Sequence, residues 1–253
     1  YSSAVYPDAG ADLAAAQQYK LKLICDRLQL KPTDHLLEIG TGWGGLAIYA
    51  AQHYGCKVTT TTISQQQYDY AKSRIEALGL QDKISLLLND YRDLEGQYDK
   101  LVSIEMIEAV GDDFLDQYFA KCSSLLKDDG LMVLQAITIA DQRYSHYVKE
   151  VDFIKRYVFP GGCLPSISRM TDAVNRKTDL VVRHLHDIGF DYARTLKDWC
   201  DNFMHARDRV HQLGYDDNFV RLWQFYLCYC EGGFRERATS AVHMVLSKPE
   251  NRN

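Results

Sequence analysis

The amino-acid sequence predicts an α/β fold built on a mostly parallel sheet with helices on both faces. Between residues 35 and 138, short apolar or β-branched segments alternate with segments of helical spacing. A glycine-rich turn follows the first apolar segment, where a strand would bend sharply into a helix. The 253 residues are 46% apolar and 25% charged, which is typical of a globular domain with a continuous core.

Five strands and three helices are expected in this alternating part. Residues 35–39 form a short apolar run, and residues 58–63 are rich in threonine and other β-branched residues that favour strands. Ser64 is a favourable N-cap for a helix that ends near Leu78. The other expected strands are residues 84–88, 98–104 and 130–138, and the other expected helices are residues 46–54 and about 113–126.

The rest of the chain adds an insertion and two strands. Residues 142–159 are expected to form one long helix that closes in a turn rich in proline and glycine, and we assign residues 142–178 to a lid over the site. The expected elements that follow are a strand over 180–185, two helical stretches between about 195 and 237, and a strand over 240–246. Residues 1–253 then form a single domain with seven strands, and residues 1–34 form a helical cover.

Composition excludes several classes of function. A net charge of −5 gives no general attraction to nucleic acid or to an anionic membrane surface. Seven scattered cysteines without C-x-x-C spacing argue against both a disulfide framework and a zinc site, so we expect a reducing cytoplasm and no bound metal. The sequence does not begin with methionine, and we expect further chain before Tyr1.

The turn over residues 38–45 is suited to a nucleotide-containing cofactor. Glycines let the backbone approach a ligand without a Cβ in the way, and Gly40, Gly42 and Gly45 fit the dinucleotide pattern G-x-G-x-x-G. That pattern also requires an acidic residue about 20 positions on, where this chain has only threonines. Glu38 instead suits the cationic amino-acid end of S-adenosylmethionine, so we favour this cofactor over a nicotinamide dinucleotide.

Polar side chains at the ends of the next two strands are candidates for the rest of the cofactor. Thr62 and Gln67 follow one strand, and Asp90 and Tyr91 follow the other. Asp90 has an acceptor for the adenine amino group and Tyr91 has a ring for stacking. Taken singly, Ser64 could serve only as a cap and Asp90 only as a turn residue, but their joint position at strand ends favours a ligand site.

The chain resembles the cyclopropane-fatty-acyl-phospholipid synthase family, including its plant-type branch. The stretches that carry the resemblance are residues 1–4, 16–22, 37–45, 62–67, 104–111, 152–166, 189–192 and 230–234. It implies the Rossmann-like fold of class I methyltransferases with a helical insertion after the fifth strand. It also implies cofactor contacts at Tyr1, Ser2, Gly44, Ile63 and Ile104.

The resemblance further implies transfer of a carbon to the double bond of an unsaturated phospholipid acyl chain, which forms a cyclopropane ring. By this resemblance, a bicarbonate ion would take the surplus proton. The residues that would hold the ion are Ser3, Glu108, Gln135, Ile137 and Tyr192. Glu108 directly follows a buried strand, where a carboxylate needs a partner or ligand, although it could also cap a helix. The Tyr192 hydroxyl could donate a hydrogen bond to an anion. Without the resemblance, an ordinary half-buried tyrosine is an equally good interpretation of this residue.

Two departures from the family pattern leave the product open. Ser3 stands where many members have cysteine, and Gln135 stands where many have histidine. A histidine that could take the proton is therefore absent at position 135. A methyl or methylene branch by the same first step therefore remains an alternative to the ring. Glu105 is expected to support Glu108 from the same helical face, since the two are three residues apart.

The substrate and the location also stay open. A methyltransferase for a small soluble molecule and a non-catalytic binding protein remain possible beside the lipid-modifying enzyme. Tyr157 and Phe159 could face a developing cation, but packing in the core is the default for aromatic residues. For a lipid substrate we expect a cytoplasmic protein with transient, peripheral membrane contact through the insertion, and we leave a homodimer open.

Overall fold

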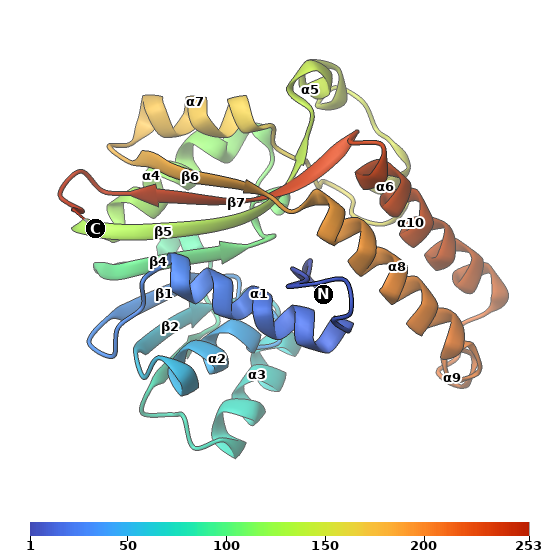
Figure 1. Ribbon diagram of the computed structural model, residues 1–253, viewed down its shortest axis with the longest axis horizontal. Coiled ribbons are helices and arrows are strands. Elements are labelled where there is room, and N and C mark those ends of the chain that lie inside the picture. The colour runs from blue at the N-terminus through green and yellow to red at the C-terminus, as the bar shows by residue number, and fades with distance from the viewer. Residues whose placement is uncertain (253) are drawn as a thin grey trace.

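The computed structural model describes residues 1–252 and contains a seven-stranded sheet in the order β3-β2-β1-β4-β5-β7-β6 (Figure 1). The strands are β1 (His35–Ile39), β2 (Lys57–Thr61), β3 (Ile84–Leu87), β4 (Tyr98–Ile104), β5 (Leu126–Ile139), β6 (Val181–Asp187) and β7 (Thr239–Ser247). Neighbouring strands from β3 to β5 are parallel, and β7 is antiparallel to both β5 and β6. The predicted α/β fold with a mostly parallel sheet is confirmed.

Helices cover both faces of this sheet. On one face lie α1 (Leu13–Arg27), α2 (Gly45–His53) and α3 (Gln65–Ala77), whose apolar residues form one buried cluster with alternate residues of the strands. On the other face lie α4 (Leu115–Ser124) and α7 (Ile167–Lys177), which form the second cluster. Because side chains alternate across a strand, Leu36 belongs to the first cluster and Leu37 to the second.

The predicted cap at Ser64 is confirmed. Its side-chain oxygen accepts a hydrogen bond from the backbone N–H of Gln67 at 3.3 Å, as expected of an N-cap. Asp12, Ser166 and Asp216 cap α1, α7 and α10 (Asp217–Arg235) in the same way. Such caps satisfy backbone donors that have no partner inside the helix and fix where each helix begins.

The predicted long helix over residues 142–159 is wrong. Two short helices, α5 (Asp141–Tyr147) and α6 (Phe153–Tyr157), occupy this region. Asp152 caps α6, and Lys155 Nζ donates to the carbonyl oxygens of Tyr147 at 2.6 Å and Glu150 at 2.9 Å. These contacts satisfy backbone acceptors across the break, so the chain can leave the helix there without a proline or glycine.

The predicted lid over residues 142–178 is too long, because its last part belongs to the core. Met170, Ala173 and Val174 of α7 are buried in the core cluster beneath the sheet. Since α7 is one of the helices that cover the sheet, only the segment before it projects over the carboxyl ends of the strands (Figure 1).

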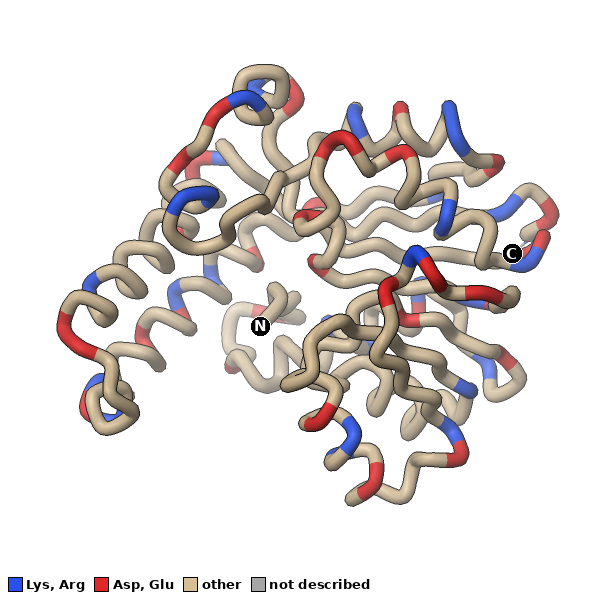
Figure 2. Tube along the Cα trace, turned by 180° about the vertical axis from the view of Figure 1, so that it is seen from behind, with Lys and Arg blue, Asp and Glu red and all other residues tan. Residues whose placement is uncertain are grey.

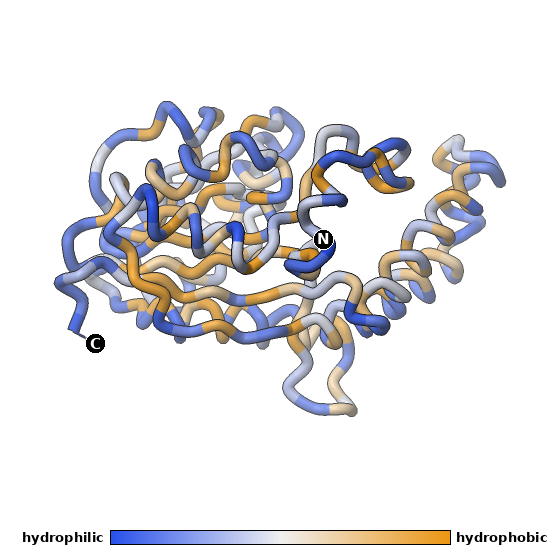
Figure 3. The backbone as a smooth tube through the Cα atoms, turned by 90° about the horizontal axis from the view of Figure 1, so that it is seen from above, coloured by the Kyte–Doolittle hydropathy of each residue, from blue (hydrophilic) through white to orange (hydrophobic). Residues whose placement is uncertain are grey.

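A helical arm extends from the sheet beyond the strand ends. It consists of α8 (Gly189–His205), α9 (Arg207–Gln212) and α10, with α8 and α10 packed side by side (Figure 1). Figure 3 shows hydrophobic residues concentrated in the strands, whereas they alternate with hydrophilic residues along the arm. The sequence predicts two helices starting near residue 195, and this start is six residues late because Gly189 is typical of a turn.

Gly189 instead allows close packing at the first residue of α8. A Cβ at this position would lie 2.4 Å from Ser240 Oγ of β7, closer than any real contact. The glycine is therefore needed for the approach of helix to strand and not for a bend.

The first twelve residues are not helical, so the expected helical cover is confined to α1. They run between α1 and α8 (Figure 1), where Ala4 N–H donates to Thr195 Oγ1 at 3.2 Å and Tyr6 N–H to Asp191 Oδ1 at 2.9 Å. This path buries Ser3 next to the ends of β4 and β5, although it is far from them in sequence.

Candidate functional site

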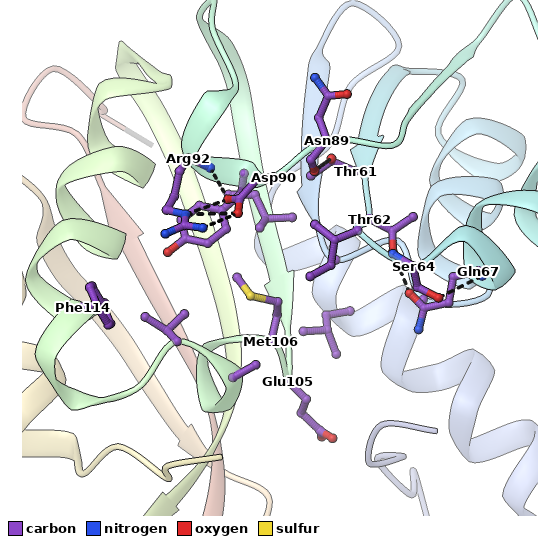
Figure 4. Close-up of a pocket in the computed structure, with 18 of the residues that line it drawn as sticks. Thr61, Thr62, Ser64, Gln67, Asn89, Asp90, Arg92, Glu105, Met106 and Phe114 are labelled. Carbon is purple, nitrogen blue, oxygen red and sulfur yellow. Dashed lines mark hydrogen bonds and ion pairs between the residues drawn. The ribbon is translucent and has the colours of Figure 1, made fainter. Parts of the chain in front are cut away.

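The glycine turn after β1 borders a cavity of about 510 Å³ at the carboxyl ends of the parallel strands. Gly40, Gly42 and Gly44 have φ values of 100°, 53° and 80°, which side chains other than glycine rarely adopt. Figure 4 shows polar residues from three successive strand ends around this cavity. Of the predicted cofactor contacts, it is lined by Tyr1, Gly40, Gly42, Thr62, Ile63, Gln67, Asp90, Tyr91 and Ile104.

A second cavity of about 240 Å³ shares Tyr1, Gly40, Gly42 and Ile104 with the first. It adds the predicted contacts Ser2 and Glu38. Gly44 lines neither cavity, because a Cβ there would face Ala71 of α3 at 3.3 Å. Gly44 therefore allows the turn to pack closely on α3, and its predicted contact with the cofactor stays a prediction.

The smaller cavity holds a buried carboxyl group and a buried amine. Glu38 is 3% exposed and accepts a hydrogen bond from Thr60 Oγ1 at 2.6 Å, and burial raises its pKa to about 8. Lys20 is also 3% exposed, donates to Ser2 Oγ at 2.8 Å, and has its pKa lowered to about 8 by burial. The pair can face the two ends of an amino-acid group.

Lys20 was not identified from the sequence, although a signal exists. Ala16, Lys20 and Ile24 are spaced four apart on α1, and all three are buried. A lysine on the buried stripe of a helix is unusual and usually has a partner or a function.

The larger cavity is bounded by side chains that already bind one another. Asp90 caps a short 3-10 helix and pairs with Arg92, whose Nη2 lies 2.7 Å from Asp90 Oδ2, and this contact lowers the pKa of the carboxyl. Asp90 is thus a turn residue that also lines the cavity, and its predicted hydrogen bond to adenine stays a prediction. Thr62 Oγ1 donates to Gln67 Oε1 at 2.8 Å (Figure 4). Gln67 Nε2 donates to Tyr1 OH at 3.1 Å.

Glu105 is the centre of a polar cluster beside the larger cavity. Its Oε1 accepts hydrogen bonds from Ser3 N–H at 2.9 Å and Gln135 Nε2 at 2.7 Å, and its Oε2 accepts one from Tyr192 OH at 2.8 Å. The backbone of Glu105 has a φ of 49°, which ends β4 in a sharp bend. The prediction that Glu105 and Glu108 share a helical face is wrong, because only Glu108 lies in the short helix that follows.

Glu108 binds the neighbouring strand. Its Oε1 accepts a hydrogen bond from Ile137 N–H of β5 at 2.6 Å, whereas its buried Oε2 has no partner within residues 1–252. Burial, and then the charge of Glu105, raise the pKa of Glu108 to about 8. It therefore does not cap a helix, and near neutral pH it carries a proton.

The five residues predicted to hold bicarbonate lie together, but four of them already donate to the two carboxyl groups, and only Glu108 Oε2 is without a partner within residues 1–252. Ser3 N–H, Gln135 Nε2 and Tyr192 OH donate to Glu105, and Ile137 N–H donates to Glu108. An added anion would need these donors and would lie against an ionised carboxylate. The cluster as folded does not fit a bicarbonate ion.

A chain of contacts fixes the orientation of Gln135. Its Oε1 lies 2.8 Å from Nε2 of the buried His243, whose Nδ1 faces Arg27 Nη1. Arginine only donates, so Nδ1 must accept and Nε2 must carry the hydrogen that is given to Gln135. Burial and the charge of Arg27 hold the pKa of His243 well below its usual value, so this arrangement persists at neutral pH. Neither His243 nor Arg27 was identified from the sequence.

Replacing Glu108 by glutamine is expected to change how stability depends on pH. Because the folded-state pKa is raised from 4.5 to about 8, the folded protein holds a proton that the unfolded chain has lost, and the free energy of unfolding falls as pH rises between these values. Glutamine does not ionise, so the variant should gain at least about 1 kcal/mol over the wild type on moving from pH 5 to pH 9. Urea unfolding at both pH values measures this, and parallel curves would contradict it.

Within residues 1–252, no group of three or more His, Cys, Asp and Glu side chains is placed to hold a metal ion.

Comparison with known proteins identifies the family of the chain. The family model "Mycolic acid cyclopropane synthetase" matches residues 1–244. The chain is 39% identical over 242 residues to "Tuberculostearic acid methyltransferase UfaA1" of Mycobacterium tuberculosis, covering 93% of this chain and 56% of that protein.

A second curated relative is equally similar. The chain is 40% identical over 248 residues to the "Cyclopropane-fatty-acyl-phospholipid synthase" of Escherichia coli K12, covering 98% of this chain and 62% of that protein. It thus spans little more than half the length of these relatives. The solved structure of "mycolic acid cyclopropane synthase CmaA1 complexed with SAH and CTAB" matches with a TM-score of 0.90 and 25% identity, over 98% of this chain and 90% of that one.

Proposed function

The chain belongs to the mycolic acid cyclopropane synthetase family, and from this membership we propose that it transfers a carbon from S-adenosylmethionine to the double bond of an unsaturated phospholipid acyl chain. The product we propose is a cyclopropane ring. The observation that supports this most is the buried polar cluster of Glu105, Gln135 and Tyr192 directly beside the cavity of the glycine turn. Ring closure requires removal of a proton from carbon, and the cluster supplies a carboxylate beside the cavity that can take it.

The two cavities fit S-adenosylmethionine. When bound, this cofactor supplies a methyl group on a positively charged sulfur, which an alkene can attack. The smaller cavity offers Glu38 to the ammonium group and Lys20 to the carboxylate. The larger cavity, at about 510 Å³, lies in the usual range for small-molecule sites and offers Gln67, Asp90 and Tyr91 to the nucleoside.

Aromatic residues of the arm enclose the cluster on the substrate side in this proposal. The centroid of the Tyr192 ring lies 4.4 Å from that of Phe234 and 6.2 Å from that of Trp199. Phe159, in the turn after α6, adds a ring whose centroid lies 6.0 Å from that of Tyr226 of the arm. Such rings exclude water and suit an acyl chain. The expectation that Tyr157 and Phe159 pack in the core is wrong, since they are 59% and 53% exposed.

We also propose that the chain binds the membrane surface transiently through an aromatic patch formed by Phe153 and Tyr157 of α6 and Phe225 and Tyr229 of α10. Phe153 contacts Phe225 at 4.9 Å and Tyr229 at 5.7 Å, so the two helices present one surface. Figure 2 shows both acidic and basic residues along the helical arm. No helix within residues 1–252 is long and apolar enough to cross a bilayer. Contact would therefore depend on aromatic residues at the lipid interface.

Replacing Phe225 by aspartate should weaken this contact. Phe225 is 54% exposed, so the change adds a charge to the patch without disturbing the core. We expect about 10-fold less protein to sediment with vesicles of an unsaturated phospholipid, in line with the loss of about 1.5 to 3 kcal/mol of apolar burial. The control is Leu78→Asp, which adds the same charge at a residue 46% exposed at the end of α3. Equal sedimentation of both variants would argue against the patch.

The proposed reaction is tested by expressing the protein, with any chain that precedes Tyr1, in a bacterium that lacks this activity. Mass spectrometry of the lipids should show acyl chains heavier by one CH2 and without the double bond. Unchanged lipids would contradict the proposal. Turnover of a water-soluble acceptor but not of vesicles would identify a small-molecule methyltransferase, and cofactor binding without any turnover would identify a binding protein.

A branched acyl product is the second candidate. It is favoured by the similarity to a tuberculostearic acid methyltransferase, which at 39% identity is as close as the synthase at 40%. The proton NMR spectrum of the same lipid extract separates the two products, because ring protons and a branch methyl resonate in different regions.

A further inference from the structure

Every group within hydrogen-bond distance of the Glu105 carboxylate is a donor. These donors are the backbone N–H of Ser3, the amide of Gln135 and the hydroxyl of Tyr192, at 2.9, 2.7 and 2.8 Å. A protonated carboxyl group would need an acceptor for its hydrogen, and among these three contacts only the Tyr192 hydroxyl oxygen could accept, which would leave the hydroxyl hydrogen without its Glu105 acceptor. Donors facing both oxygens therefore stabilise the ionised form of Glu105.

The backbone of Glu105 is in a strained conformation. A non-glycine residue with a φ of 49° is strained by about 1–2 kcal/mol, and such strain persists where the surroundings determine the conformation. The bend brings Glu105 to the wall of the larger cavity, beside Met106 (Figure 4), and a Cβ at Gly40 would lie 3.4 Å from the Met106 side chain. The carboxylate thus lies between the proposed cofactor site and the aromatic residues of the arm.

The two acidic side chains of the cluster have different surroundings, since Glu105 accepts three hydrogen bonds and Glu108 accepts one. Burial and the nearby Glu105 raise the pKa of Glu108, in the short helix that follows, to about 8. Burial lowers the pKa of Lys20 to about 8, and the charge of Glu105 opposes this shift. Two neighbouring acids whose environments separate their protonation states are typical of acid–base sites. The contacts from Arg27 through His243 to Gln135 hold the amide with its NH2 group toward Glu105.

We propose that Glu105 is the base of the reaction and occupies the place where the family resemblance put a bicarbonate ion. In this step the alkene carbon bonds to the methyl carbon as the carbon–sulfur bond breaks, which leaves S-adenosylhomocysteine and a carbocation on the acyl chain. One hydrogen of the added methyl group passes as a proton to a Glu105 oxygen, and the electron pair of that C–H bond closes the ring. The proton then leaves to solvent, so no external anion is consumed. This inference rests on the proposed function.

The test compares wild type with Glu105→Gln, in buffer stripped of carbon dioxide and with added bicarbonate. Glutamine keeps the size of the side chain but is not a base, so turnover of unsaturated phospholipid should fall by about 10²–10⁴-fold. Binding of S-adenosylhomocysteine, measured by calorimetry, should be unchanged. Wild-type turnover should be the same with and without bicarbonate. A wild type that requires bicarbonate, or a Glu105→Gln variant of normal rate, would overturn the proposal.

Glu105→Gly supplies a second test that does not depend on turnover. Glycine accepts the positive φ and leaves the donors of Ser3, Gln135 and Tyr192 without a carboxylate. Bicarbonate or formate should then raise the melting temperature of this variant and partly restore its turnover, with no effect on the melting temperature of the wild type. An equal rise in both proteins would show that the wild-type cluster holds an anion and would refute the inference. If the wild type modifies no lipid, the proposed reaction fails, while the melting experiment still tests whether Glu105 occupies the anion site.

Discussion

Replacing Gly40 by valine is expected to weaken binding of S-adenosylhomocysteine by about 100-fold or more, which corresponds to about 3 kcal/mol. Gly40 has a φ of 100°, and a β-branched residue with such a φ is a severe outlier. A Cβ there would already lie 3.4 Å from Cβ and Cγ of Met106, so the two valine methyl groups have little room. The turn must change shape or its valine must enter both cavities, since Gly40 lines each of them.

Calorimetric titration of wild type and variant measures this loss. Gly232→Ala is the matched control, because Gly232 is an exposed residue in α10 with no atom within 4 Å of its added Cβ. Alanine should stabilise that helix by about 0.5–1 kcal/mol without changing the affinity. Normal affinity of Gly40→Val, with a normal melting temperature, would show that the glycine turn is not the binding element.

The cofactor side of the site was predictable because it depends on local order. Glycines, threonines and polar residues that directly follow strands must meet at one edge of a parallel sheet, so Gly40, Thr62 and Asp90 could be placed together without a structure. The sheet itself was predictable for the same reason. The first four strands contain short apolar or β-branched runs, and the segments between them have helical spacing.

The polar cluster was only partly predictable because it depends on contacts distant in sequence. Ser3 and Gln135 meet Glu105 across separations of 102 and 30 residues, and no periodicity reports such contacts. The predicted helical face shared by Glu105 and Glu108 is wrong because it requires a helix where a positive φ at Glu105 ends the strand. The long helix over 142–159 is wrong for a similar reason, since a lysine side chain satisfies the carbonyl oxygens at its break.

Replacing Glu38 by glutamine should weaken binding of S-adenosylhomocysteine by about 10- to 100-fold near pH 8, as expected for a lost charge-assisted contact of about 1.5–3 kcal/mol. In the free protein, burial raises the pKa of Glu38 to about 8, so at pH 6 the carboxyl group is protonated. A ligand ammonium group needs the ionised form, so binding must release this proton. Wild-type affinity should therefore rise with pH between about 6 and 8, by up to about tenfold per unit.

The variant should lose this pH dependence as well as the affinity, because glutamine has no proton to release. Lys20, whose pKa burial lowers to about 8, stays largely protonated below that pH in both proteins and does not account for the difference. Titrations at pH 6, 7 and 8 in two buffers of different ionisation enthalpy give the affinity and the number of protons released. If wild type and Glu38→Gln show the same slope, the proton comes from another group, and the ammonium end of the ligand does not face Glu38. The buried carboxyl would then serve only to join β1 to β2 through Thr60, at a distance of 2.6 Å.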